Sequence, residues 1–321
     1  MKKVILTVVI ILFVIVAGVA SYIKFGLPNV GDPENIHIQS TPEKVAHGAY
    51  LANHVTLCMD CHSTRDWSEF SGPLVSGTEG KGGERFDQKM GFPGVFYSKN
   101  ITPANLKDWT DGEIFRAITT GVDKDGNALF PVMPYHNYGK MDKEDIYDII
   151  AYLRSLAPIE NKTPDHQVDF PMNFILNTIP VKAEFVQRPP KSDTLKYGAY
   201  LTNATACMEC HTQVDKGQII PKLAFGGGRV FEMPNGKVSS ANITPDPGTG
   251  IGGWTAEQFV ARFKAYSVPG NIPKMAAGQV NTIMPWVMYS GMDTSDLRSI
   301  FAYLQTVKPI KNQVVHFVQN K

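Results

Sequence analysis

The sequence GAYLANHVTLCMDCH at residues 48–62 recurs as GAYLTNATACMECH at residues 198–211. Each copy ends in two cysteines that are separated by two residues and followed at once by a histidine. These runs contain all 4 cysteines of the chain, Cys58, Cys61, Cys207 and Cys210. Because 4 cysteines are too few to stabilise a chain of 321 residues by disulfides, the pairs predict a metal or cofactor site rather than a disulfide scaffold.

The repeat continues beyond the cysteines in the same order. The further pairs are NITP at 100–103 and 242–245, WT at 109–110 and 254–255, MPY at 133–135 with MPW at 284–286, and AYL at 151–153 and 302–304. Ordered matches over most of the chain indicate a duplication, and two copies are too few for a solenoid. We therefore predict two like domains, at residues 41–160 and 191–312.

The stretch between the predicted domains, residues 161–190, is rich in proline. Its prolines exclude a long helix and favour an extended linker. The middle of this linker, Phe170–Val181, is apolar but too short to cross a bilayer. We expect it to pack across both domains.

Each domain is predicted to be mainly α-helical. A helix starts at Thr41-Pro42-Glu43 and runs into the first cysteine pair. Capping boxes open the middle helices and aspartates cap the last ones, while short hairpins fit only the glycine-rich stretches 72–98 and 217–240. The capping residues are Thr110 with Glu113, Thr255 with Gln258, Asp142 and Asp293.

The composition describes a globular protein with balanced charge. Lys and Arg number 31 and Asp and Glu 30, a formal net charge of +1, so the basic surface of a nucleic-acid-binding protein is not indicated. Hydrophobic residues make up 43% of the chain and charged residues 19%, which excludes a disordered chain.

The N-terminus, residues 1–25, predicts a membrane-targeting segment. Val4–Ala20 is almost wholly apolar and follows Lys2 and Lys3. This run reads as an uncleaved transmembrane anchor, with a cleaved signal peptide as the alternative. Either interpretation exports the remaining chain, so we expect the domains on the outer, periplasmic face of a bacterial cytoplasmic membrane.

The pattern CxxCH is the attachment site of haem c, in which two thiols form thioethers and the histidine binds iron. A thioredoxin-like redox pair or half of a zinc site are the alternatives, and neither explains His62 and His211. We therefore predict two covalent haems, held by the four cysteines, with these histidines as iron ligands.

The second axial ligand should also occur twice. The other histidines are not repeated, and surface or capping roles are expected for them. Met133 and Met284 are repeated, each before a proline that favours an extended loop, and they are predicted to ligate iron. Met141 and Met292 are paired as well, but their place before the last helices favours packing, which makes them the second choice.

Other repeated residues fit around such a haem. Pro73 and Pro221 follow the histidines and offer carbonyls to the imidazole Nδ1–H, although ordinary turn prolines have the same spacing. The indoles of Trp109 and Trp254 suit hydrogen bonds to propionates, with core packing as the alternative. Two arginines, Arg85 and Arg229, could pair with propionates, and a solvated surface position is the alternative for both.

Together these motifs resemble the class I cytochrome c family. The runs from Asn100 to Thr110 and from Met133 to Leu156 are more narrowly similar to cytochrome subunits of membrane-bound alcohol and gluconate dehydrogenases. The resemblance implies a mainly α fold of two tandem class I cytochrome c domains, joined by the Pro-rich linker behind an N-terminal transmembrane helix. Those subunits carry three haem motifs and this chain has two.

The expected function is electron transfer by a membrane-anchored dihaem cytochrome c, without catalytic residues of its own. The donor would be a dehydrogenase or a quinol-oxidising complex, and the acceptor an oxidase or a soluble cytochrome. The alternative is a dihaem enzyme such as a peroxidase, which needs one haem open to substrate. A sensory module is the remaining possibility, but no output domain is evident.

Overall fold

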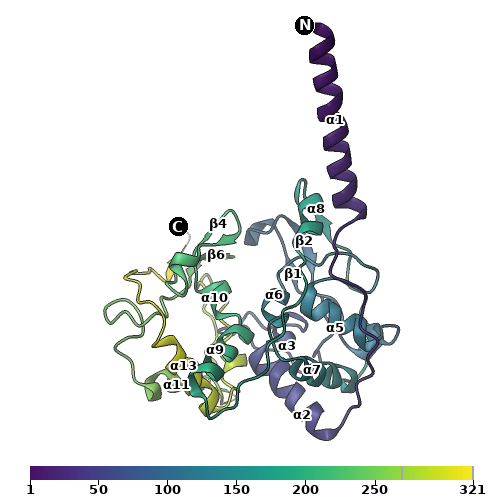
Figure 1. Cartoon of the computed structure of the whole chain (residues 1–321). Coiled ribbons are helices and arrows are strands. Elements are labelled where there is room, and N and C mark those ends of the chain that lie inside the picture. Colours follow the sequence, from purple (N-terminus) through teal and green to yellow (C-terminus); the bar gives the residue numbers. More distant parts are fainter. Residues whose placement is uncertain (269, 320–321) are drawn as a thin grey trace.

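The computed structural model describes residues 1–268 and 270–319. An isolated helix, α1 (Lys2–Phe25), projects from a body made of two lobes (Figure 1). The first lobe contains α2 (Pro42–Tyr50), the π-helical turn η1 (Leu51–Val55), α3 (Cys58–Cys61), α4 (Pro103–Leu106), α5 (Asp111–Thr120), α6 (Tyr135–Tyr138) and α7 (Lys143–Ser155). The second contains α9 (Thr194–Ala204), α10 (Cys207–Cys210), α11 (Ala256–Lys264), α12 (Trp286–Tyr289) and α13 (Thr294–Leu304).

Each lobe is built around one close helix crossing. In the first lobe α2 packs on α7, and in the second α9 packs on α13. A glycine lies at each crossing, where a Cβ on Gly48 would clash with the carbonyl of Asp148 and one on Gly198 with that of Ser299. The repeated glycines therefore set how closely the first and last helices of each lobe approach.

Most of the predicted helix starts are confirmed. Both capping boxes form, at Thr110 with Glu113 and at Thr255 with Gln258. Asp142 accepts from the backbone N–H of Glu144, as a capping residue does. The expected cap at Asp293 was wrong, because its carboxylate makes no capping hydrogen bond and lies 3.6 Å from the Lys191 ammonium.

The first helix does not run unbroken into its cysteine pair, contrary to expectation. It ends at Tyr50 and continues as the π-helical turn η1, whereas α9 in the second lobe stays α-helical to Ala204. The first copy of the repeat is one residue longer than the second. A π-turn holds one more residue than an α-turn, so η1 absorbs the extra residue without moving the cysteines.

Short antiparallel sheets cover one end of each lobe. The first joins β1 (Arg85–Phe86), β2 (Gly94–Tyr97) and β3 (Gln167–Val168), with Phe86 opposite Phe96. The second joins β6 (Val230–Met233), β7 (Gly236–Ser239) and β8 (Phe317–Gln319), with Phe231 opposite Val238. The hairpins expected in the glycine-rich stretches are thus present. A two-stranded ribbon pairs β4 (Val214–Asp215) with β5 (Gln218–Ile219).

The linker follows a different course from the one expected. It forms the short helix α8 (Met172–Ile175) and the 3-10 turn η3 (Leu176–Thr178), and both pack against α1 (Figure 1). The prediction that Phe170–Val181 packs across both domains was wrong. Phe170 is 81% exposed, and only Leu176 and Pro180 of this stretch are buried.

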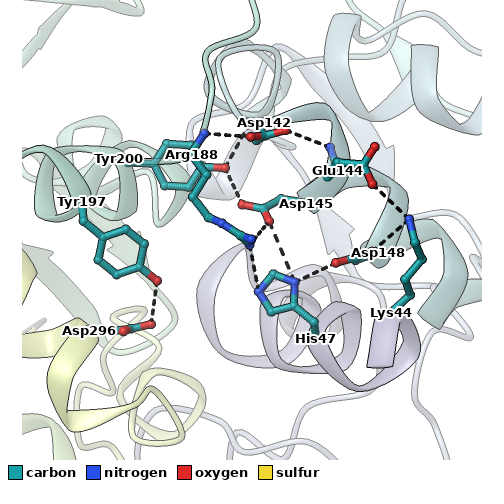
Figure 2. Close-up of polar contacts among 10 residues, drawn as sticks. All are labelled: Lys44, His47, Asp142, Glu144, Asp145, Asp148, Arg188, Tyr197, Tyr200 and Asp296. Atoms are coloured by element: carbon teal, nitrogen blue, oxygen red, sulfur yellow. Dashed lines mark hydrogen bonds and ion pairs between the residues drawn. The ribbon is translucent and has the colours of Figure 1, made fainter. Parts of the chain in front are cut away.

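The two lobes are joined by exchanged hydrogen bonds. The Tyr50 hydroxyl donates to Asp296 of the second lobe (2.8 Å), and the Tyr200 hydroxyl donates to Asp145 of the first (2.5 Å). Figure 2 shows Arg188 of the linker reaching both Asp145 and His47. Asp145 and Asp296 are fully buried, so these contacts satisfy carboxylates that would otherwise be isolated from water.

Candidate cofactor site

The cysteines lie on two one-turn helices with matching surroundings. The residues before them, Leu57 and Ala206, adopt the left-handed conformation, at φ 55° and 51°. A threonine hydroxyl lies beside the first thiol of each pair, 3.3 Å from Cys58 Sγ and 3.1 Å from Cys207 Sγ. The structure therefore presents both pairs in one conformation, despite the different turns that lead into them.

A tyrosine from each methionine loop closes the same turn. The Tyr138 hydroxyl donates to the carbonyl of Thr56 (2.6 Å) and the Tyr289 hydroxyl to that of Thr205 (2.7 Å). Each bond ties the short helix after the Met-Pro motif, α6 or α12, to the residue two positions before the first cysteine. The cysteine pair and the methionine loop of a lobe are thus held in a fixed relation.

The histidines after the cysteines have one ring nitrogen engaged by a backbone carbonyl. His62 Nδ1 lies 2.6 Å from the Lys99 oxygen, and His211 Nδ1 lies 2.7 Å from the Ala241 oxygen. A carbonyl fixes the tautomer with the proton on Nδ1, which leaves Nε2 as the metal-binding nitrogen. Burial lowers the pKa of both histidines, so the neutral, ligating form is favoured.

These carbonyls correct the role expected for Pro73 and Pro221. The Pro73 oxygen accepts from the Asp66 N–H (2.8 Å), and the Pro221 oxygen accepts from Ala224 at the start of η4 (Pro221–Leu223). Both prolines shape turns near the histidines without reaching the imidazole. The actual partners, Lys99 and Ala241, directly precede the repeated NITP motif, which was the available but unused signal.

The thiols are not arranged for redox or zinc chemistry. Burial raises the pKa of all four, that of Cys207 to about 11, whereas a reactive redox pair needs a lowered pKa. Among the described residues, the one cluster of three or more possible metal-binding side chains is His47, Asp145 and Asp148. Lys44 and Arg188 pair with that cluster, which makes it an ion network between the lobes (Figure 2).

One cavity of about 3180 Å³ extends through both lobes. Its volume is about three times the upper range for a single drug-sized ligand, at roughly 1,000 Å³. Its lining is mainly apolar and includes both cysteine pairs, both adjacent histidines, both predicted methionine ligands and both tryptophans: Cys58, Cys61, His62, Trp109, Met133, Cys207, Cys210, His211, Trp254 and Met284. The donor set of thiol, imidazole and thioether, doubled in one apolar space, fits two haem c groups.

The methionine loops are held differently in the two lobes. Met133 O accepts from the N–H of Tyr135, and Met284 O accepts from that of Trp286, both at 2.8 Å. Met284 O also accepts from the Ser71 hydroxyl of the first lobe (2.6 Å), and the same Ser71 oxygen accepts from Trp286 N–H (2.9 Å). Sequence reasoning missed Ser71, because the second copy has Ile219 at the corresponding place before Pro221, so repetition did not mark the serine.

The second-choice methionines are packing residues in this structure. Met141 is 0% exposed and Met292 is 1% exposed, and both belong to the hydrophobic core. Their burial agrees with the expected apolar role before the last helices. The ligand assignment of Met133 and Met284 stays a prediction, as do the propionate contacts of Trp109 and Trp254.

In the first lobe, the arginine that lines the cavity is not the expected one. Arg229 lines the cavity and donates to the Glu209 carbonyl, but Arg85 pairs with Asp87 (2.6 Å) and does not line it. Arg65 lines the cavity instead and donates to Asp60 (3.0 Å), the acidic residue between the first two cysteines. Arg65 and Arg229 lie in different loops, so comparison of the two repeats did not pair them.

Comparison with known proteins supports the cytochrome interpretation. No family model matches the chain. It is 27% identical over 283 residues to the cytochrome c subunit of a quinone alcohol dehydrogenase from Gluconacetobacter polyoxogenes, covering 83% of this chain and 56% of that one. The chain is related to c-type cytochromes.

Two further relatives agree. The fructose dehydrogenase cytochrome subunit of Gluconobacter japonicus is 26% identical over 305 residues, 91% of this chain and 57% of its own. A diheme cytochrome c-type protein of Cereibacter sphaeroides is 27% identical over 264 residues, 79% of this chain and 83% of its own. The chain thus spans little more than half the length of the dehydrogenase subunits, but most of the length of the diheme protein.

Proposed function

We propose that this chain is a dihaem cytochrome c that transfers single electrons and has no catalytic site of its own. Residues 41–160 and 191–312 would be two class I cytochrome c domains joined by the linker at 161–190. The observation that carries the proposal is the single apolar cavity lined by both CxxCH motifs and both Met-Pro loops. The relatives, which are named cytochrome subunits and a diheme cytochrome, support it.

The residues of each lobe have distinct parts in this proposal. The cysteine thiols would hold each haem covalently as thioethers, and the histidine Nε2 and the methionine sulfur would be the ligands of its iron. Haem supplies reversible one-electron chemistry at its iron. The Lys99 and Ala241 carbonyls keep each imidazole oriented. The apolar lining would limit the access of water to the haem.

The membrane location and the redox partners belong to the same proposal. The only helix among the described residues that is long and apolar enough to span a bilayer is α1, and a signal sequence would pass the same test. We assign it as an anchor that holds the lobes on the periplasmic face of the cytoplasmic membrane. The electron donor would be a dehydrogenase or a quinol-oxidising complex, and the acceptor an oxidase or a soluble cytochrome.

The axial ligands provide the decisive test. In the haem-loaded protein, Met133→Leu and Met284→Leu should each abolish the weak red absorption band of methionine-to-ferric-iron ligation at one haem, lower its potential and open its iron to carbon monoxide. Met141→Leu and Met292→Leu keep similar volume and serve as controls, with unchanged spectra expected. A native protein that binds carbon monoxide would instead indicate an enzyme with an open haem.

A further inference from the structure

The apolar part of α1 matches the thickness of a bilayer. Between Lys3 and Lys24 it runs uncharged from Val4 to Ile23, about 20 residues and about 30 Å at 1.5 Å per residue. Tyr22 and Phe25 at its end are 60% and 80% exposed, where aromatic side chains favour the membrane–water interface. If the charged ends lie in the headgroup regions, Ile23 marks the outer edge of the hydrocarbon core.

The linker contacts α1 at this level. The Asn177 side-chain amide donates to the Ile23 carbonyl (3.2 Å), and both α8 and η3 pack on the helix. Figure 1 shows α8 beside the foot of α1, on the side of the first lobe from which the helix projects. A membrane crossed by α1 would therefore meet this part of the linker at headgroup depth.

The linker presents apolar side chains there. Phe170 is 81% exposed and Phe174 39%, and no charged residue occurs from Phe170 to Val181. Ile175 is also exposed, but it lines the large cavity and is therefore left out of this surface. Two phenylalanine side chains exposed beside a membrane helix are costly in water but favourable in the interfacial region of a bilayer. The stretch is too short to span the bilayer, so it can enter the membrane only by lying in the plane of the membrane–water interface.

We propose that the linker stretch 170–181 is a second membrane contact, which inserts Phe170 and Phe174 among the lipids of the outer leaflet. This inference rests on the proposed anchor. The bilayer is the occupant because the stretch lies against the end of the span and carries no charge. Two contact points, α1 and the linker, fix the tilt of the lobes and hence the side that each haem cavity presents to soluble partners.

Spin labels on the full-length protein in phosphatidylcholine–phosphatidylglycerol nanodiscs test the contact. Labels at Val14→Cys, Phe174→Cys and Leu195→Cys are compared for collision with oxygen, which enters lipid, and with a nickel chelate, which stays in water. Leu195 is 49% exposed on α9 and serves as the water control. We expect oxygen to dominate at 14, a clear shift towards oxygen at 174, and nickel to dominate at 195.

The outcomes separate the two proposals. A label at 174 that collides mainly with nickel, or with neither reagent, overturns the lipid contact while a lipid-exposed label at 14 preserves the anchor. A label at 14 in water overturns both. In oriented bilayers, Phe170→Ser/Phe174→Ser should broaden the angular spread of the haem resonances, whereas Leu195→Ser should not.

Discussion

At the residue scale, one serine makes the two Met-Pro loops unequal. Ser71 is 1% exposed and adopts φ 64°, held by the Asn281 side chain of the second lobe (2.9 Å). Its hydroxyl bridges the Met284 carbonyl and the Trp286 N–H, so the ligand loop of one lobe depends on a loop of the other. Met133 has no such support from the second lobe among the described hydrogen bonds, in which its carbonyl accepts from Tyr135.

We therefore expect Ser71→Ala to loosen Met284 and leave Met133 unchanged. The loss of two hydrogen bonds, each about 1 kcal/mol, should raise carbon monoxide binding at the second haem by about thirtyfold. The measurement is carbon monoxide titration of each haem, resolved by its potential. Ser68→Ala is the control, because that exposed hydroxyl in the same loop bonds only Asp66 within the described contacts. Equal effects at both haems would contradict the assignment.

At the element scale, the glycine crossings decide the helix pairs. The α2–α7 and α9–α13 pairs contribute core residues to each lobe, including Ile149, Leu201 and Ile300. Their backbones touch at Gly48 and Gly198, where any side chain would push the helices apart. The capping boxes at Thr110 and Thr255 act more locally, since they satisfy only the first turn of one helix.

Gly48→Ala and Gly198→Ala should each lower the free energy of unfolding by about 3 kcal/mol, because a methyl group must displace the backbone of the partner helix. Chemical denaturation followed by circular dichroism measures the loss. Gly248→Ala is the matched control, since the nearest atom to its Cβ would be 3.7 Å away. A loss below about 0.5 kcal/mol at the crossings, a value typical of surface substitutions, would show that the helices yield easily.

At the scale of the whole molecule, the lobes are locked by buried polar contacts. The π-helical turn that absorbs the extra residue of the first repeat carries His54, whose Nδ1 lies 2.8 Å from the Met288 carbonyl of the second lobe. A Cβ on Gly291 would collide with the same imidazole, so His54 fills a slot in its partner lobe. The surface or capping role expected for the unrepeated histidines is therefore wrong for His54.

This histidine predicts a pH dependence of stability. Burial, with Lys264 nearby, lowers the pKa of His54 from its ordinary value of 6.5. The unfolded chain then binds more protons than the folded one below about pH 6.5, so acidification destabilises the lobe contact. Differential scanning calorimetry between pH 7.5 and 5.5 should show a falling melting temperature, and a shallower fall in His54→Gln.

His136 and His166, whose pKa values burial also lowers, remain in that variant, so part of the slope should persist. Burial raises the pKa of Asp145, which acts in the opposite direction, but it does so in both proteins and cancels in the comparison. Parallel pH profiles for the native chain and His54→Gln would exclude the histidine as their source.

The sequence by itself determined what local chemistry dictates. The CxxCH motifs, the repeat, the capping boxes and the apolar N-terminal run each concern residues close together in the chain, whose spacing has a direct physical meaning. They predicted a helix-rich fold and a set of site residues that remains a prediction. They also predicted the relationship to cytochromes, which the comparisons confirm. The Met133 and Met284 loops were found because repetition marks paired residues even when they lie far from the histidines.

Only the tertiary structure decided which distant groups meet. Backbone carbonyls are present in every residue, so no composition or spacing could select Lys99 and Ala241 over the prolines as partners of the histidines. The place of Ser71, Arg65 and His54 depends on how two lobes with unequal loops pack together. The linker likewise packs against α1 and leaves Phe170 exposed. An apolar sequence predicts that a stretch avoids water, but it does not say whether protein or lipid covers that stretch.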